Sequence, residues 1–134
     1  MATYLLDTTV IVDVLNGKHH RNELLAGLIR QGNTLACCAI NVAEVFAGMR
    51  PHEAAATDAL LKSLDYYEVT WEIAKRAGAL KYQQARRGRT LSLADTIIAS
   101  VAMSYGLTLV TDNVKDYSIK GLPIAGLQLY PLRP

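Results

Sequence analysis

Apolar and polar positions along the chain alternate between two kinds of block. Short apolar runs with the length of buried strands lie at residues 3–7, 34–40, 66–69 and 107–111, with a candidate for a last short strand at residues 126–130. Between them, apolar side chains recur every three or four positions, which is typical of helices. These helical segments cover residues 9–17, 20–32, 42–49, 52–64, 70–88 and 92–106.

Glycine and proline punctuate this pattern where helices should end. Gly17, Gly32 and Gly106 each stand at the end of a helical segment, and Pro51 follows another. Strands that alternate with helices indicate a parallel sheet covered by helices on both faces. We therefore expect one α/β domain over residues 1–134, in three layers (α/β/α), with a central parallel sheet of four or five strands.

Several chemically active side chains follow predicted strands directly. Asp7 and Thr111 end two strands, and Asn41 and Glu44 follow a third. In parallel sheets, ligands bind beyond the carboxyl ends of the strands, so these residues converge on the place where a site is expected. Asp95 belongs to the same group, because it lies on a helix that is otherwise almost entirely apolar and must find a partner if it is buried.

Each acid, taken alone, also has an ordinary structural explanation as a helix cap. Asp7 precedes a helix, while Glu44 in "NVAE" and Asp95 in "SLAD" fit the capping-box spacing. Together, however, three acids at one sheet edge would repel one another unless a cation lay between them. A hard divalent ion such as Mg²⁺ or Mn²⁺ is the natural candidate.

The distribution of charge points to a polyanionic partner. The chain has 14 basic and 12 acidic residues, a net charge of +2. Residues 73–94 contain no acid but six basic residues, among them Arg86, Arg87 and Arg89. A solvated helix face is the plain explanation for such a stretch, and a footprint for nucleic acid is the alternative. If Asp7, Glu44, Asp95 and Asp116 face a metal, 14 basic groups remain against 8 acidic ones.

Composition narrows the class of protein. The chain is 51% hydrophobic and 19% charged, as in ordinary globular proteins. No apolar run reaches the roughly 20 residues that span a bilayer, and the N-terminus lacks a basic signal-peptide region. The adjacent Cys37 and Cys38 suit reduced, buried thiols on a strand. We expect a cytoplasmic protein without a membrane partner.

Three segments together resemble one known family. "LLDTTVIVDVLNG" around Asp7, "AINVAEVFAGM" around Glu44 and "LSLADTIIASVAMSYGLTLVTDNVKDY" around Asp95 occur in the order and spacing of PIN-domain ribonucleases. The chain is most similar to the VapC-type toxins of type II toxin–antitoxin systems. This resemblance implies a PIN-like α/β/α fold, Mg²⁺- or Mn²⁺-dependent cleavage of RNA, neutralisation by a small VapB-like antitoxin, and a homodimer.

The resemblance also assigns roles to residues. Asp7, Asp95 and Glu44 correspond to the metal ligands, and Asn113 stands where the family's fourth acid belongs, with Asp116 one helical turn further on. These five are the candidate catalytic residues. Asparagine brings a carbonyl oxygen but no charge, so a second metal position stays open.

The basic stretch and two threonines complete the candidate site. Arg86, Arg87 and Arg89 precede the Asp95 helix and are candidates for RNA contacts. Thr8 and Thr111 are placed to hydrogen-bond a carboxylate or a phosphate, or simply to cap.

Other functions compete with this interpretation. A phosphatase with an aspartyl nucleophile would need a second acid two residues after Asp7, and Thr9 at that position argues against it. A non-catalytic nucleic-acid-binding or protein-interaction module would use its acids only as helix caps.

Overall fold

A five-stranded parallel sheet forms the centre of the computed structural model, which describes residues 2–126. Its strands are β1 (Thr3–Leu6), β2 (Thr34–Cys38), β3 (Asp65–Tyr67), β4 (Thr108–Thr111) and β5 (Ile124–Gly126). They lie in the order β3-β2-β1-β4-β5, and every neighbouring pair is parallel. β1 is therefore the central strand, and the order on either side of it reverses there.

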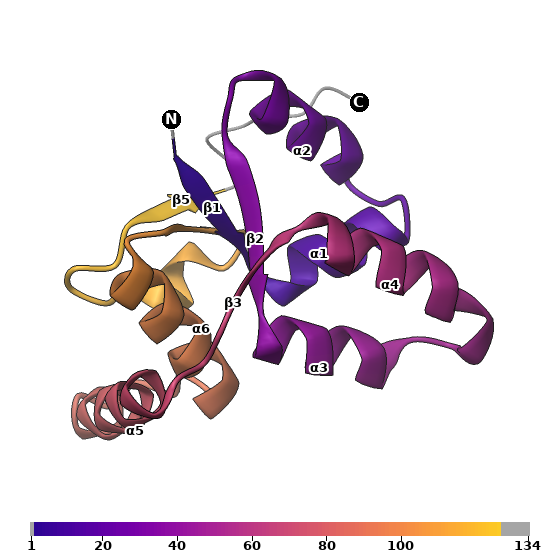
Figure 1. Ribbon diagram of the computed structural model, residues 1–134. Helices are drawn as coiled ribbons and strands as arrows, with labels where there is room; N and C mark the ends of the chain where they lie inside the picture. The colour runs from indigo at the N-terminus through magenta and orange to yellow at the C-terminus, as the bar shows by residue number, and fades with distance from the viewer. Residues whose placement is uncertain (1, 127–134) are drawn as a thin grey trace.

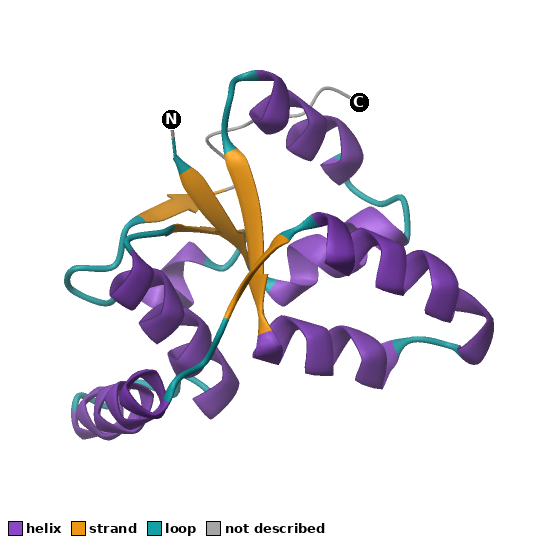
Figure 2. Cartoon of the chain, viewed as in Figure 1, coloured by secondary structure: helices purple, strands orange, loops and turns teal. Residues whose placement is uncertain are grey.

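Helices cover both faces of this sheet. The helices are α1 (Thr8–Leu15), α2 (Arg21–Arg30), α3 (Ala39–Gly48), α4 (Ala54–Ser63), α5 (Trp71–Arg86) and α6 (Leu93–Tyr105). Two short 3₁₀ turns, η1 (Pro51–Glu53) and η2 (Val114–Tyr117), complete the secondary structure of the described residues. In Figure 1, α1 to α4 gather on one side of the sheet, and α5 and α6 pack together on the other. Figure 2 shows the strands enclosed between these two groups, which confirms the expected three-layer α/β/α fold.

Alternating side chains of each strand supply the two cores. Leu5 and Leu109 belong to the core beneath α5 and α6, whereas Leu6 and Val110 belong to the core beneath α1 to α4. All four are at most 1% exposed. A strand that is buried on both faces has no polar face, which explains why the strands read as continuous apolar runs in the sequence.

Local signals place most helix boundaries. Thr70 caps α5 by accepting a hydrogen bond from the backbone N–H of Ile73 at 3.2 Å. Gly106 ends α6 in the left-handed region, at φ 69°, which glycine adopts without a steric penalty. Both ends agree with the predicted helical segments to within a few residues.

The predicted boundary between residues 34–40 and 42–49 is wrong. α3 begins at Ala39 rather than at residue 42, and β2 correspondingly ends at Cys38 rather than at residue 40. The last described strand is β5 at Ile124–Gly126; of the predicted strand at residues 126–130, residues 127–130 lie outside the described part.

The early start of α3 follows from the side chain of Asn41, which is completely buried. Its Oδ1 accepts a hydrogen bond from the backbone N–H of Cys38 at 2.8 Å, which caps the helix. Its Nδ2 donates to the carbonyl oxygen of Leu6 at 3.1 Å and to the Thr8 hydroxyl at 3.0 Å. One amide therefore ties the end of β2 to the junction between β1 and α1.

Both cysteines are free and buried on β2, as predicted. Burial raises the pKa of the Cys37 thiol to about 11, with a smaller contribution from Cys38, so this thiol stays protonated near neutral pH. Within residues 2–126, no helix combines the length and the apolar character needed to cross a membrane.

Removal of the Asn41 amide should destabilise the fold strongly. We expect Asn41→Ala to lower the free energy of unfolding by about 2–4 kcal/mol, because it leaves buried backbone groups of Cys38 and Leu6 without partners. Urea unfolding followed by circular dichroism measures this change. Asn16→Ala, at the exposed end of α1, is the matched control and should cost less than about 1 kcal/mol. Equal stability of the two variants would contradict this role of Asn41.

Candidate active site

Asp7 lies at the carboxyl end of the central strand, and its side chain is only 4% exposed. Its backbone N–H donates to the carbonyl oxygen of Val110 at 2.9 Å and so continues the pairing of β1 with β4. The carboxylate is then held on both oxygens. Oδ1 accepts from the backbone N–H of Thr8 at 2.9 Å, and Oδ2 accepts from the Thr111 hydroxyl at 2.6 Å. Asp7 is thus both the N-cap of α1 and a buried, oriented acid.

A tyrosine hydroxyl joins Asp7 to the second acid. Tyr117, the last residue of η2 and itself 3% exposed, donates to Oδ1 of Asp95 at 3.0 Å. The same hydroxyl lies 3.4 Å from Oδ1 of Asp7, a longer and weaker contact. Asp95 lies in the first turn of α6, where the Ser92 hydroxyl caps its backbone N–H at 3.1 Å. The two carboxylates therefore meet around a single proton donor.

The electrostatics of this pair follow from burial. Burial raises the pKa of the Asp7 carboxyl above its ordinary value of 3.8, and the nearby Asp95 charge adds to the rise. The hydrogen bonds from Thr111, from the Thr8 backbone and from Tyr117 act in the opposite direction. Burial and both carboxylates raise the pKa of Tyr117 far above its ordinary value of 10, so its hydroxyl keeps its proton.

Glu44 is linked to this pair through one intervening residue, Thr8. It is exposed on α3, and its Oε1 accepts a hydrogen bond from the Thr8 hydroxyl at 2.7 Å. The same hydroxyl accepts from Asn41 at 3.0 Å, while the backbone N–H of Thr8 binds Asp7. Thr8 therefore links Glu44 to Asp7, and Thr111 in the same way links the end of β4 to Asp7.

Of the three predicted acids, Asp7 and Asp95 are joined by one tyrosine hydroxyl, and Glu44 is linked to Asp7 through Thr8. Within residues 2–126, no three Asp, Glu, His or Cys side chains gather closely enough to hold one metal ion between them. Asp7 and Asp95 share Tyr117, and Glu44 is connected through Thr8. Such a pair can offer carboxylate oxygens to a small cation and can orient water, which are the elements of hydrolytic chemistry.

Asn113 and Asp116 lie on the exposed rim beside the pair. The backbone N–H of Asn113 donates to the Thr111 hydroxyl at 3.0 Å, and that of Asp116 donates to the carbonyl oxygen of Asn113 at 3.0 Å. Both side chains are exposed. Asn113 immediately precedes η2 and Asp116 lies within it, and the same turn carries Tyr117 into the site, so these hydrogen bonds fix the position of the tyrosine as well.

The three arginines that are predicted to bind RNA make different contacts in the structure. Arg89 donates a hydrogen bond to the carbonyl oxygen of Ser118, and it lines a hollow together with Lys115 and Asp116. Arg86 instead contacts Tyr82 of its own helix, with a hydrogen bond of 3.0 Å and its guanidinium 5.7 Å from the ring centre. Arg87 is exposed at the end of α5. Among the three, Arg89 is therefore the one that contacts the segment bearing Asp116.

Tyr117 and Asn41 are the site-building residues whose roles the sequence analysis did not predict. The "NVAE" spacing predicts Asn41 as the N-cap of a helix with Glu44 three residues on, whereas the structure places Asn41 inside α3, with its side chain bonded back to the N-cap residue Cys38. Nothing in the sequence analysis assigns a role to Tyr117. One signal could have pointed to Tyr117: a residue with a hydroxyl follows Asp116 directly, in a short loop that leaves a buried strand. Its contact with Asp95, 22 positions earlier, depends on the packing of η2 against α6.

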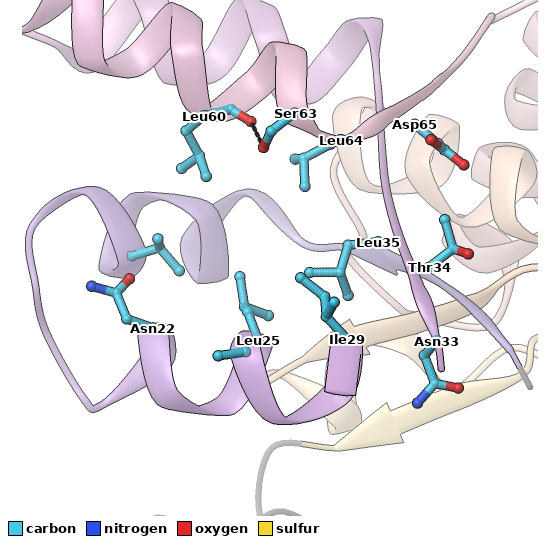
Figure 3. Close-up of a pocket in the computed structure, with 12 residues that line it drawn as sticks. Asn22, Leu25, Ile29, Asn33, Thr34, Leu35, Leu60, Ser63, Leu64 and Asp65 are labelled. Carbon is cyan, nitrogen blue, oxygen red and sulfur yellow. Dashed lines mark hydrogen bonds between the residues drawn. The ribbon is translucent and has the colours of Figure 1, made fainter. Parts of the chain in front are cut away.

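A larger hollow opens at the opposite edge of the sheet. Its volume is about 500 Å³, and it is lined mainly by apolar residues of α2, α4 and the beginning of β2. Figure 3 shows Leu25 and Ile29 of α2 facing Leu60 and Leu64 across it. Because Thr34 at the start of β2 lies on its wall, this hollow belongs to the amino-terminal edge, away from Asp7.

Sequence comparisons relate the chain to one family. Residues 4–120 match the family model of the PIN domain. Ribonuclease VapC19 of Mycobacterium tuberculosis is 35% identical over 115 residues, which are 84% of this chain and 90% of that protein. Ribonuclease VapC2 of Haemophilus influenzae is 26% identical over 122 residues, which are 87% and 91% of the two chains.

Solved structures share the fold over nearly the whole chain. VapBC2 from Rickettsia felis, bound to a DNA fragment from its promoter, matches with a TM-score of 0.81 and 25% identity, over 92% of this chain and 98% of that one. A toxin–antitoxin complex from Klebsiella pneumoniae matches with a TM-score of 0.75 and 27% identity, over 91% and 95%. The match to the family model, together with the VapC19 relative, shows that the chain belongs to the PIN-domain family, among proteins of the VapC type.

Proposed function

We propose that this protein is a Mg²⁺- or Mn²⁺-dependent endoribonuclease that acts as the toxin of a toxin–antitoxin pair. The observation that carries the proposal is the pair Asp7 and Asp95, two carboxylates that share one tyrosine hydroxyl at the carboxyl edge of the sheet. The curated relatives of the chain are named ribonucleases, which supports RNA as the substrate.

The residues present fit a divalent cation. None of the ion pairs within residues 2–126 includes Asp7 or Asp95, so no basic side chain there neutralises either acid. Burial and mutual repulsion raise the free energy of the charged pair, and a cation would relieve both. Mg²⁺ commonly binds one or two carboxylates and keeps several waters, which matches two acids joined by one tyrosine hydroxyl and a third, Glu44, linked through Thr8.

The capping alternative accounts for one acid of the three. Asp7 does cap α1, but its second oxygen binds Thr111. The N-cap residue of α3 is Cys38, whose backbone N–H binds the side chain of Asn41, and the N-cap residue of α6 is Ser92. No cap hydrogen bond to the side chain of Glu44 or Asp95 occurs at the described start of either helix. A non-catalytic module would have no need to aim these two acids at the same edge as Asp7.

In the proposed reaction, a divalent cation held by Asp7 and Asp95 would supply Lewis-acid activation of water and neutralise charge that develops on the phosphate. Thr111 and Tyr117 hold the two carboxylates in fixed orientations, since both hydroxyls donate to them. Glu44, exposed on α3, is placed to accept a proton or to orient water.

The rim beside the pair supplies groups that can contact RNA. Asn113 offers an amide at the rim without adding negative charge. Arg89 and Lys115, which line one hollow, would contact the RNA backbone.

The toxin role rests on the relatives and on an unfilled apolar surface. Solved neighbours include a VapBC assembly and a complex described as toxin–antitoxin. We propose that the hollow between α2 and α4 receives an apolar segment of the antitoxin, because Ile29 is 57% exposed there among leucines. This surface lies at the amino-terminal edge of the sheet, away from Asp7. The homodimer stays a prediction.

Loss of either carboxylate of the pair should abolish RNA cleavage. We expect Asp7→Asn and Asp95→Asn each to lower kcat/KM on an RNA oligonucleotide by on the order of 100-fold or more, as should EDTA. Asp58→Asn on α4, whose acid pairs with Lys62 far from the site, is the matched control and should cleave as the wild type does. Cleavage by Asp7→Asn at the wild-type rate would show that the activity belongs to a contaminant.

Without a bound metal ion, the charged carboxylates of Asp7 and Asp95 should lower the stability of the folded protein at neutral pH. Since the folded protein raises the pKa of Asp7 above 3.8, the neutral carboxyl favours folding, and this contribution is lost as the pH rises through the raised pKa. In EDTA at pH 7, Asp7→Asn should therefore melt about 2–6 °C above the wild type, and the gap should shrink toward pH 4. Mn²⁺ should raise the melting temperature of the wild type only. A gap that widens on acidification, or a variant that responds equally to Mn²⁺, would refute this description.

A charge placed in the apolar hollow should break antitoxin binding. We expect Ile29→Glu to weaken capture of a cognate VapB-like antitoxin by about 10-fold or more in co-expression and affinity purification, because the carboxylate would lose its water in the complex. Gln31→Glu adds the same charge just beyond α2, outside the hollow, and should bind normally. Retention of the partner by Ile29→Glu would exclude the hollow as its docking site.

A further inference from the structure

A largely buried arginine lies at the beginning of α2. Arg21, the first residue of α2, keeps only 13% of its side chain exposed and lies between two acids. Its Nε is 3.7 Å from Oδ2 of Asp13, and its Nη2 is 3.8 Å from Oδ2 of Asp112. Nε has no hydrogen-bond partner within the described residues, so its charge is balanced at ion-pair distance rather than by a hydrogen bond.

One of these acids borders the active site. Asp112 follows Thr111, whose hydroxyl holds Asp7, and precedes Asn113 on the rim. Its other oxygen, Oδ1, lies 3.4 Å from the hydroxyl of Thr9. A carboxylate at this position would add a negative charge next to the place where an RNA phosphate must bind.

The chain adopts an unusual backbone to bring Arg21 to this place. His19 and His20 are both in the left-handed region, at φ 56° and 54°, although neither is glycine. Nη1 of Arg21 donates to the carbonyl oxygen of His19 at 3.2 Å, and Nδ1 of His19 lies 3.1 Å from Oδ2 of Asp13. The connection between α1 and α2 is therefore organised around the guanidinium and its acidic partners.

We infer that Arg21 is a positioning residue of the proposed nuclease, which neutralises Asp112 and keeps it turned away from the pair Asp7 and Asp95. The inference rests on the proposed function. Without Arg21, Asp112 becomes an uncompensated acid at the rim. An added negative charge there attracts a divalent cation and repels RNA, so the two ligands respond in opposite directions.

This opposite response separates a charge role from a structural one. Loosening of the loop would weaken both ligands together, whereas an unmasked carboxylate strengthens one and weakens the other. The second signature is rescue, because Asp112→Asn removes the same charge that Arg21 otherwise balances.

The test compares Arg21→Gln, Asp112→Asn and the double variant at low ionic strength. Binding of a fluorescent single-stranded RNA is measured by anisotropy in EDTA, and binding of Mn²⁺ alone by the rise in melting temperature. We expect Arg21→Gln to bind RNA about 3- to 10-fold more weakly and to gain more stability from Mn²⁺ than the wild type. The double variant should return both quantities to near the wild-type values, and Asp112→Asn alone should bind RNA more tightly.

Two controls exclude simpler explanations. Arg30→Gln removes the same charge from the exposed end of α2 and should change RNA binding less than 2-fold, roughly the effect of one distant, screened charge. Arg21→Lys keeps the charge and should stay near the wild type in both assays. If Arg21→Gln weakens both ligands and Asp112→Asn restores neither, Arg21 is only structural. A wild type that binds neither RNA nor Mn²⁺ would instead overturn the proposed function, and this role with it.

Discussion

The site depends on the position of one carboxylate at the end of the central strand. β1 lies between β2 and β4, and the backbone of Asp7 is itself paired with Val110. The side chain therefore cannot turn to solvent, and a buried acid without partners would be very costly. The register that pairs Leu6 with Val110 brings Thr111 beside Asp7, so sheet pairing itself supplies the partner that the acid needs.

Two further side chains, those of Asn41 and Tyr117, both hold elements of the fold together and contact residues of the candidate site. Asn41 ties the end of β2 to the end of β1 and also binds the Thr8 hydroxyl that reaches Glu44. Tyr117 brings η2 against α6 and donates to Asp95. Asn41 and Tyr117 thus both join elements of the fold and hold side chains of the candidate site, so packing and chemistry are set by the same residues.

The sequence predicts the layers of this fold well because periodicity and strand burial are local properties. The acids Asp7 and Asp95 could also be found, since an acid after an apolar run and an acid on an apolar helix are both visible in the chain. Tyr117 and Arg21 could not, because their meaning arises from contacts with residues far along the sequence, such as Asp112 for Arg21. The start of α3 was missed for a similar reason, since its cap is the side chain of Asn41 reaching back to Cys38.

Charge balance gives the unusual features of the rim a common explanation. A nuclease site needs enough negative charge to hold a cation, yet each extra acid repels the substrate. Here Asn113, which is neutral, stands where the resemblance to the family places a fourth acid, and the neighbouring Asp112 lies at ion-pair distance from Arg21. Both arrangements limit the free negative charge beside the pair Asp7 and Asp95. The left-handed backbone at His19 and His20 directly precedes Arg21, so this strained turn brings a cation to the acid that borders the candidate site.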